Sequence, residues 1–229
     1  MFKNLFELWH REDLLQQSFD DAVKMLEMAE DIYKKAVAPF FGTQTVEAQE
    51  IYNIDQKINH FEISIRRKVL EHISISAEQD TTAALVLTTI SVDIERIGDY
   101  AKNFMELWEL YGKSLTDIPM FDRLEQICNN ILKMFENTIS SFKNADSETA
   151  LKVMELHVIN SKNCEEIIAA LVRTPTSTKS FDSNQEVLVA LAARYFKRTS
   201  AHLKNIASST INPFDRIGYK PNSETEYTF

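Results

Sequence analysis

Residues 95–104 read Glu95-Arg96-Ile97-Gly98-Asp99-Tyr100-Ala101-Lys102-Asn103-Phe104, and a related stretch recurs at residues 197–206. Arg96, Lys102 and Asn103 of the first stretch match Arg198, Lys204 and Asn205 of the second. Each residue therefore recurs 102 positions later, since residue 95 corresponds to residue 197. A shift of this length indicates a duplicated unit of domain size rather than a short solenoid repeat. The two acids do not recur, because Lys197 and Ala201 stand where the first stretch has Glu95 and Asp99.

The composition favours long helices with few connections. The 229 residues include only 4 Gly and 5 Pro, against 44% hydrophobic and 26% charged residues, so residues that form turns are scarce. Apolar residues recur every three or four positions along six segments, whereas no alternating strand pattern appears. The sequence therefore predicts an all-α fold of two tandem antiparallel three-helix bundles.

The six predicted helices follow from this periodicity and from capping residues. The third helix starts after the N-capping run Asp80-Thr81-Thr82 and reaches Tyr111 before the C-capping Gly112; the fifth opens at Asp146 and ends before Pro175. The other four run from about Arg11 to Ala38, Thr45 to Ser76, Pro119 to Phe142 and Asn184 to Ala207.

Three parts of the chain follow from these helices. Residues 1–112 form the first repeat with an apolar N-terminal segment, residues 113–208 form the second, and residues 209–229 form a C-terminal tail. The polar stretch from Thr174 to Ser180 is a loop. The N-terminal segment either packs on the bundle or contacts a partner or a membrane; its apolar residues are Phe2, Leu5, Phe6, Leu8 and Trp9.

Several classes of function are disfavoured by the sequence. A net charge of −9 argues against a nucleic-acid binder, and no apolar run is long enough to span a bilayer. Cys128 and Cys164 lie inside helical patterns and are expected to be reduced core thiols of a cytoplasmic protein. No phosphate-binding glycine loop, GxSxG or HExxH pattern is present, so we expect no enzymatic activity and no catalytic residues.

Acidic residues on two of the predicted helices suggest a cation site. Glu95 and Asp99 are four residues apart and so lie one turn apart on one helix face. Asp55, Asn59 and Glu62 of the second helix are also spaced about one turn apart. They lie beside the apolar stripe, or seam, by which we expect this helix to pack, Ile54-Ile58-Phe61. Together these oxygens would suit Mg²⁺, Mn²⁺ or iron. The alternative is a solvated acidic face that binds no metal.

The stretch from Ile94 to Phe104 resembles the signature of the third helix of the PhoU family, Leu-Glu-Arg-Ile-Gly-Asp-His-Ala-x-Asn-Ile. The segment Asp55-x-x-Ile58-Asn59-x-x-Glu62 resembles the acidic motif of that family's second helix, with Asn59 in place of the usual acid. The resemblance covers roughly residues 14–207. It implies a cytoplasmic, dimeric regulator of inorganic phosphate uptake that acts beside a phosphate transporter and often a sensor kinase. It also implies a bound metal, Fe, Mn, Mg or Zn, and contact with the membrane only through the partner.

The second repeat departs from the family pattern. Its seam is kept, but the metal motif is lost at Lys197 and Ala201, and the fifth helix is expected to place Ser161 and Glu165 where the second has Asp55 and Asn59. We therefore expect the second repeat to serve structure and partner binding. Such a pattern is similar to PhoU-like proteins that accompany single-component or sodium-coupled phosphate transporters. Two other functions remain open, a metal-dependent carboxylate-bundle enzyme and a metal-free dimerising scaffold.

Overall fold

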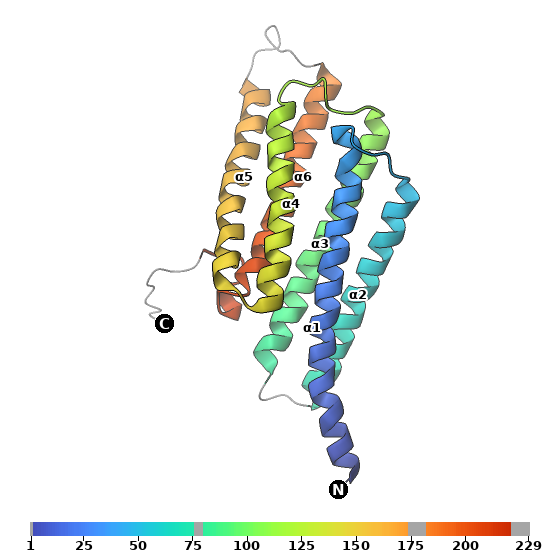
Figure 1. Cartoon of the computed structure of the whole chain (residues 1–229), viewed down its shortest axis with the longest axis vertical. Coiled ribbons are helices and arrows are strands. Elements are labelled where there is room, and N and C mark those ends of the chain that lie inside the picture. Colours follow the sequence, from blue (N-terminus) through green and yellow to red (C-terminus); the bar gives the residue numbers. More distant parts are fainter. Residues whose placement is uncertain (1, 76–79, 174–181, 221–229) are drawn as a thin grey trace.

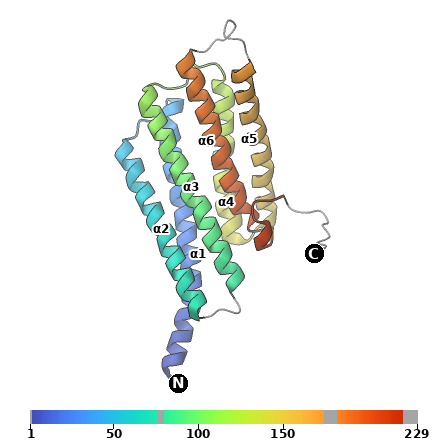
Figure 2. The same cartoon turned by 180° about the vertical axis from the view of Figure 1, so that it is seen from behind.

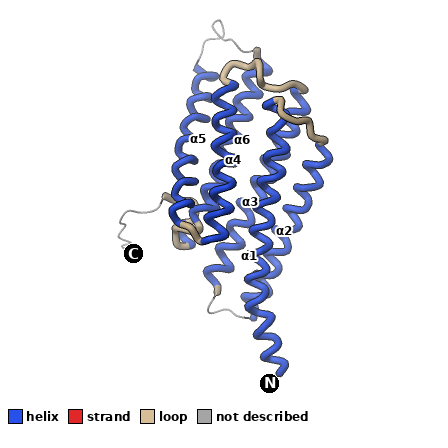
Figure 3. The backbone as a smooth tube through the Cα atoms, viewed as in Figure 1, coloured by secondary structure: helices blue, strands red, loops and turns tan. Residues whose placement is uncertain are grey.

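A computed structural model describes residues 2–75, 80–173 and 182–220, with side chains from residue 14 onward. In these ranges the chain forms six long helices and no strand, which confirms the predicted all-α fold (Figures 1 and 3). The helices are α1 (Phe2–Val37), α2 (Ala48–Ile75), α3 (Thr81–Tyr111), α4 (Phe121–Asn144), α5 (Ser147–Arg173) and α6 (Ser183–Ser208). Within the described ranges, no helix is both long and apolar enough to cross a membrane.

The helix ends follow local chemistry. Gly112 takes the left-handed conformation, with φ of 70°, and ends α3 as predicted. The Asp146 carboxylate accepts hydrogen bonds from the backbone N–H groups of Glu148 and Thr149, 3.0 and 3.2 Å long, and so starts α5. A capping box between Asp182 and Gln185 starts α6. α1 ends before Pro39, which lies in the short 3₁₀ helix η1 (Ala38–Phe41).

Three predictions at the ends of the chain have different outcomes. α1 begins at Phe2, nine residues before the predicted start at Arg11, because nothing in the sequence interrupts the helix there. The side chains of its first residues and the predicted 174–180 loop lie outside the described residues. After α6 the chain folds back through turns and a second 3₁₀ helix, η3 (Phe214–Arg216), which packs against α3. The proposed boundaries between repeats and tail stay predictions.

Burial repeats along the chain at the predicted shift. α3 begins at Thr81 and α6 at Ser183, so the same shift of 102 residues relates the two starts. The apolar residues Ile90, Ile94, Ala101 and Phe104 of α3 are buried, and so are their counterparts in α6: Ala192, Phe196, Leu203 and Ile206. α4 repeats the buried pattern of α1 at the same shift. Its buried Leu124, Ile127, Cys128, Ile131, Met134 and Phe135 correspond to Ala22, Met25, Leu26, Ala29, Ile32 and Tyr33.

α3 and α6 join the two repeats at the centre of the molecule. They run antiparallel and pack along their length, while α2 and α5 lie at opposite edges (Figures 1 and 2). Phe104 of α3 is buried at this junction, with its ring centroid 4.8 Å from that of Phe196 and 5.4 Å from that of Tyr195. The same ring lies edge-on to Tyr33 of α1 and Phe40 of η1. One side chain thus contacts elements from both repeats.

Contacts between α3 and α6 occur in pairs related by the repeat. Asp93 of α3 accepts hydrogen bonds from His202 Nδ1 at 2.7 Å and Asn205 Nδ2 at 3.0 Å. The shift carries Asp93 onto Tyr195 and Tyr100 onto His202, and the rings of Tyr100 and Tyr195 lie 5.9 Å apart. The Asp93–His202 contact is therefore polar, and its counterpart in the other repeat, the Tyr195–Tyr100 contact, is aromatic. The repeats are related by an approximate twofold axis that passes between α3 and α6.

The polar member of this pair predicts a stability effect. Replacing Asp93 by Ala removes the acceptor of two largely buried donors, so we expect the free energy of unfolding to fall by about 1–3 kcal/mol. Urea unfolding followed by circular dichroism measures it. Glu109→Ala, an exposed change on the same helix, should stay within about 0.5 kcal/mol of the parent. Equal urea midpoints for the two variants would contradict the role of Asp93.

Candidate functional site

The buried stripe of α2 contains an acidic residue. Its buried positions are Ile51, Asp55, Ile58, Ile65, Val69 and His72, and Glu62 continues the same stripe with a half-buried side chain. Ile54 and Phe61, which we expect to form the seam, are only partly buried. The expectation is confirmed at Ile58, which is fully buried, but at Ile54 and Phe61 the buried stripe instead runs one position further along, through Asp55 and Glu62. Asp55 consequently faces α3, and its side chain is only 6% exposed.

Glu95 and Asp99 of α3 lie beside this stripe. Their side chains are 17% and 29% exposed, so they are half-buried rather than fully solvated. Between them in sequence lies Gly98, and a Cβ atom there would lie 3.3 Å from Asp55 Oδ1 and 3.4 Å from Ile58 Cδ1. The missing side chain therefore lets α2 approach α3 closely enough to bury Asp55. The structure thus brings the acids of the two helices together.

The ammonium group of Lys102 lies between two of these carboxylates. Its Nζ is 2.9 Å from Asp55 Oδ2 and 3.0 Å from Asp99 Oδ1. Burial alone would lower the pKa of Lys102, but the hydrogen bonds to Asp55 and Asp99 outweigh it, and the pKa is raised. Asn59 Nδ2 donates a further hydrogen bond to Asp55 Oδ2 at 3.2 Å. A lysine of the chain itself therefore stabilises the buried carboxylate.

Two arginines offset the remaining acids. Arg96 contacts Asp99 at 2.9 Å and Glu95 at 3.5 Å, and Arg66 contacts Glu62 at 2.8 Å. The pKa of Glu95 is nevertheless raised, first by burial and then by the charge of Asp99, with further contributions from Glu62 and Asp55. Burial and the neighbouring carboxylates therefore both disfavour the charged form of Glu95.

These residues fit a cation in part. Asp55 Oδ1 and Asn59 Oδ1 are buried with no hydrogen-bond partner, and oxygen atoms of this kind are the ligands that Mg²⁺ and Mn²⁺ prefer. Among the described residues, however, no three His, Cys, Asp or Glu side chains lie close enough together to hold a metal ion. Lys102 occupies the space between Asp55 and Asp99. A metal could join these acids only after that ammonium group has moved away.

The second repeat carries different chemistry at the same positions. His157 Nδ1 lies 2.9 Å from Ser200 Oγ, and Ser200 is the counterpart of Gly98. His157, rather than Ser161, therefore stands where the first repeat has Asp55, which corrects the expected correspondence by one helical turn. Ser161 takes the place of Asn59. Lys197 pairs with Glu165 at 2.6 Å, across the α5–α6 contact.

Sequence reasoning missed the cations of the first site. Lys102 follows Asp99 by three residues, a spacing that places the two side chains on one helix face, and this signal could have indicated the pair. Its contact with Asp55 could not be predicted, since it depends on how α2 packs on α3. His60 is exposed, as expected for a polar surface residue.

The two thiols are unreactive core groups. Cys128 and Cys164 are free and buried, as predicted. Burial raises the pKa of each to about 12, so neither forms a thiolate near neutral pH. The described residues therefore offer no cysteine nucleophile beside the acidic cluster.

The fold and the acidic cluster define a class of protein: all-α chains of two three-helix repeats with an acidic motif across the second and third helices. The PhoU domain model matches this chain twice, at residues 22–107 and 124–210, and the chain therefore belongs to the PhoU family. The two matches start 102 residues apart, in agreement with the internal shift. Among curated proteins, none matches this chain.

Two solved structures share the fold. PhoU from Pseudomonas aeruginosa is 20% identical, with a TM-score of 0.62, and the match covers 92% of this chain and 97% of that one. The phosphate transport system regulatory protein PhoU from Streptococcus pneumoniae is 13% identical, with a TM-score of 0.69 and coverage of 89% and 94%. The likeness therefore extends over both repeats in each case.

Proposed function

We propose that this protein is a non-enzymatic regulator of inorganic phosphate transport and phosphate signalling. The observation that carries the proposal is the double match to the PhoU domain, with the signature of its third helix on α3 at the centre of the molecule. The match includes the position of the signature's glycine, where Gly98 permits the close approach of Asp55.

The proposed mode of action is docking on the cytoplasmic face of a phosphate transporter, with a sensor kinase as a second partner. A protein without an active site acts through the surface that it presents, so in this proposal the partners carry the chemistry. The approximate twofold arrangement places α2 and α5 at opposite edges, where each is accessible to a partner (Figure 2). A homodimer in the cytoplasm is part of the same proposal.

A cation at the acidic cluster is a second element of the proposal. The supporting observation is the pair of unpartnered buried oxygens, Asp55 Oδ1 and Asn59 Oδ1. Glu62, Glu95 and Asp99 would supply the remaining ligands. When bound, a divalent or trivalent ion would tie α2 to α3 in place of the Lys102 ammonium group. The residues of the chain itself set how easily this exchange occurs, because Lys102 and Arg96 hold two of the acids.

A clean deletion tests the regulatory function. In cells that lack the protein we expect altered phosphate accumulation and altered phosphate signalling, restored by the parent chain. Uptake of radiolabelled phosphate and a phosphate-responsive reporter measure the two effects, and cross-linking followed by mass spectrometry identifies a co-purifying transporter. Unchanged uptake and signalling after deletion would contradict the proposal. Turnover of phosphate compounds that Glu95→Gln abolishes would favour the carboxylate-bundle enzyme instead.

The metal proposal has its own internal control. In crystals soaked with Mn²⁺ we expect an anomalous peak beside Glu95 and none beside Lys197, because an ammonium group repels a cation. Asp99→Asn should lower the occupancy by removing a ligand charge, whereas Lys102→Met should raise it by removing the competing cation. A peak beside Lys197, or none beside Glu95 even in Lys102→Met, would show that the acids form no metal site.

A further inference from the structure

The counterpart of the acidic cluster in the second repeat lies beside a groove. α5, the C-terminal half of α6 and the turn around Gly218 enclose about 830 Å³, and the lining includes His157, Ser161 and Lys204. The repeat relates these three residues to Asp55, Asn59 and Lys102, which the His157–Ser200 contact establishes for the structure. The groove thus occupies the position of the acidic cluster, with other side chains in it.

The lysine shared by both sites has lost its carboxylates in the second. Lys102 contacts Asp55 and Asp99, but the corresponding positions around Lys204 hold His157 and Ala201. In the described part of the chain, Lys204 has one hydrogen bond, to the uncharged backbone carbonyl of Gly218, and no ion pair. The Lys204 side chain is therefore a half-buried cation whose charge no neighbouring carboxylate neutralises by contact.

Burial and the nearby lysines set the protonation states in the groove. Burial lowers the pKa of Lys204, and the charge of the more distant Asp93 opposes this shift only in part. The pKa of Lys204 is therefore lowered, whereas that of Lys102 is raised. The pKa of His157 falls to about 4, through burial and through the charges of Lys204 and Lys197. At neutral pH His157 is therefore an uncharged hydrogen-bonding group, and the ammonium group of Lys204 carries the charge.

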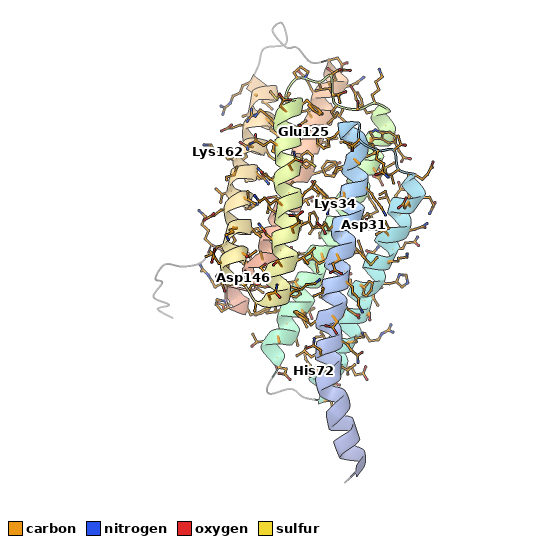
Figure 4. All side chains as sticks on the ribbon, viewed as in Figure 1. Asp31, Lys34, His72, Glu125, Asp146 and Lys162 are labelled. Atoms are coloured by element: carbon orange, nitrogen blue, oxygen red, sulfur yellow. The ribbon has the colours of Figure 1, made fainter. Side chains whose placement is uncertain are left out.

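Further cations and a hydroxyl group line the same groove. Lys162 lies on the exposed face of α5 (Figure 4) and Lys220 on the C-terminal turn, and neither forms an ion pair with a described residue. Glu165 also lines the groove, where it is paired with Lys197 and accepts a hydrogen bond from Ser161 Oγ at 3.4 Å; Glu155 forms no ion pair with a described residue. Three lysines around one hydroxyl suit an anion with several oxygens and more than one charge.

We propose that the groove between α5, α6 and the Gly218 turn binds a phosphate-type oxyanion, held by Lys204 and Ser161 with Lys162 and Lys220 at its rim. The source of the anion is either free phosphate or the phosphoryl group of a small organic molecule, whose apolar part would contact Leu151, Met154 and Val158. The inference stands on the contacts of this chain and does not depend on action at a transporter.

Calorimetric titration of the full chain with inorganic phosphate and with phenyl phosphate tests the site. We expect binding at one site, weakened about tenfold or more by Lys204→Met, because the buried cation is lost. The control is Lys152→Met, which removes the same charge from an exposed lysine on α5 that pairs with Glu148, and it should change the affinity less than twofold. Tighter binding of phenyl phosphate would identify a phosphorylated organic ligand, and equal or tighter binding of inorganic phosphate would identify free phosphate.

A second variant tests the charge argument without removing the lysine. His157→Asp would give Lys204 the carboxylate partner that Lys102 has in Asp55, so we expect it to fold normally and to abolish phosphate binding. Circular dichroism checks folding of every variant. Absence of binding by the parent chain at tens of millimolar of either probe would overturn the proposal. So would an affinity that neither Lys204→Met nor His157→Asp changes.

Discussion

The packing of α3 against α6 is the contact on which the rest of the structure depends. A three-helix unit has an apolar face that it cannot cover by itself, and here the third helices of the two repeats cover each other. Phe104 connects α3 with α1, η1 and α6 through ring contacts, so the cores of both repeats meet at one side chain. Because α3 is fixed from this side, its opposite side is free to present Glu95 and Asp99 to α2.

Duplication kept the fold and changed the charges. In the first repeat a lysine lies between two carboxylates, and a glycine lets the carboxylate-bearing helix come close. In the second repeat the same lysine position faces a histidine and an alanine, and a serine replaces the glycine. Buried charges need a partner to offset the cost of removing them from water. In the first repeat the chain itself supplies carboxylate partners for Lys102. In the second repeat, we infer that Lys204 takes its anionic partner from solution.

The sequence predicts the helices well because their signals are local. Apolar spacing, the C-capping Gly112 and the N-capping Asp146 all act within one or two turns, and the structure confirms each. Which residues of α2 face the core could not be predicted in the same way. Spacings through Ile54 and Phe61 or through Asp55 and Glu62 both repeat every three or four residues. Only packing against Gly98 selects the second, and that contact is not visible in the sequence of α2.

The same limit explains the error in the second repeat. No residue of α5 repeats the acids of α2, so the sequence offers no match by which to align the two helices. Aligning Ser161 with Asp55 therefore gave the wrong register. The His157–Ser200 hydrogen bond establishes the register instead, because Ser200 is the counterpart of Gly98, beside which Asp55 lies. Of the five proposed cation ligands, Asn59 contacts Asp55, and Lys102 contacts both Asp55 and Asp99, but no three acidic side chains of the described residues lie close enough to hold a metal ion. The lysine between them is visible only in three dimensions.

The central claim is that one lysine position is neutralised in the first repeat and not in the second. Titration of the lysine side chains by ¹³C–¹⁵N nuclear magnetic resonance, assigned with Lys102→Arg and Lys204→Arg, measures this difference directly. The pKa of Lys102 should lie above that of an ordinary lysine, because two carboxylates hold its proton, and that of Lys204 should lie below it, because burial opposes its charge. Equal pKa values, or the reverse order, would contradict the account.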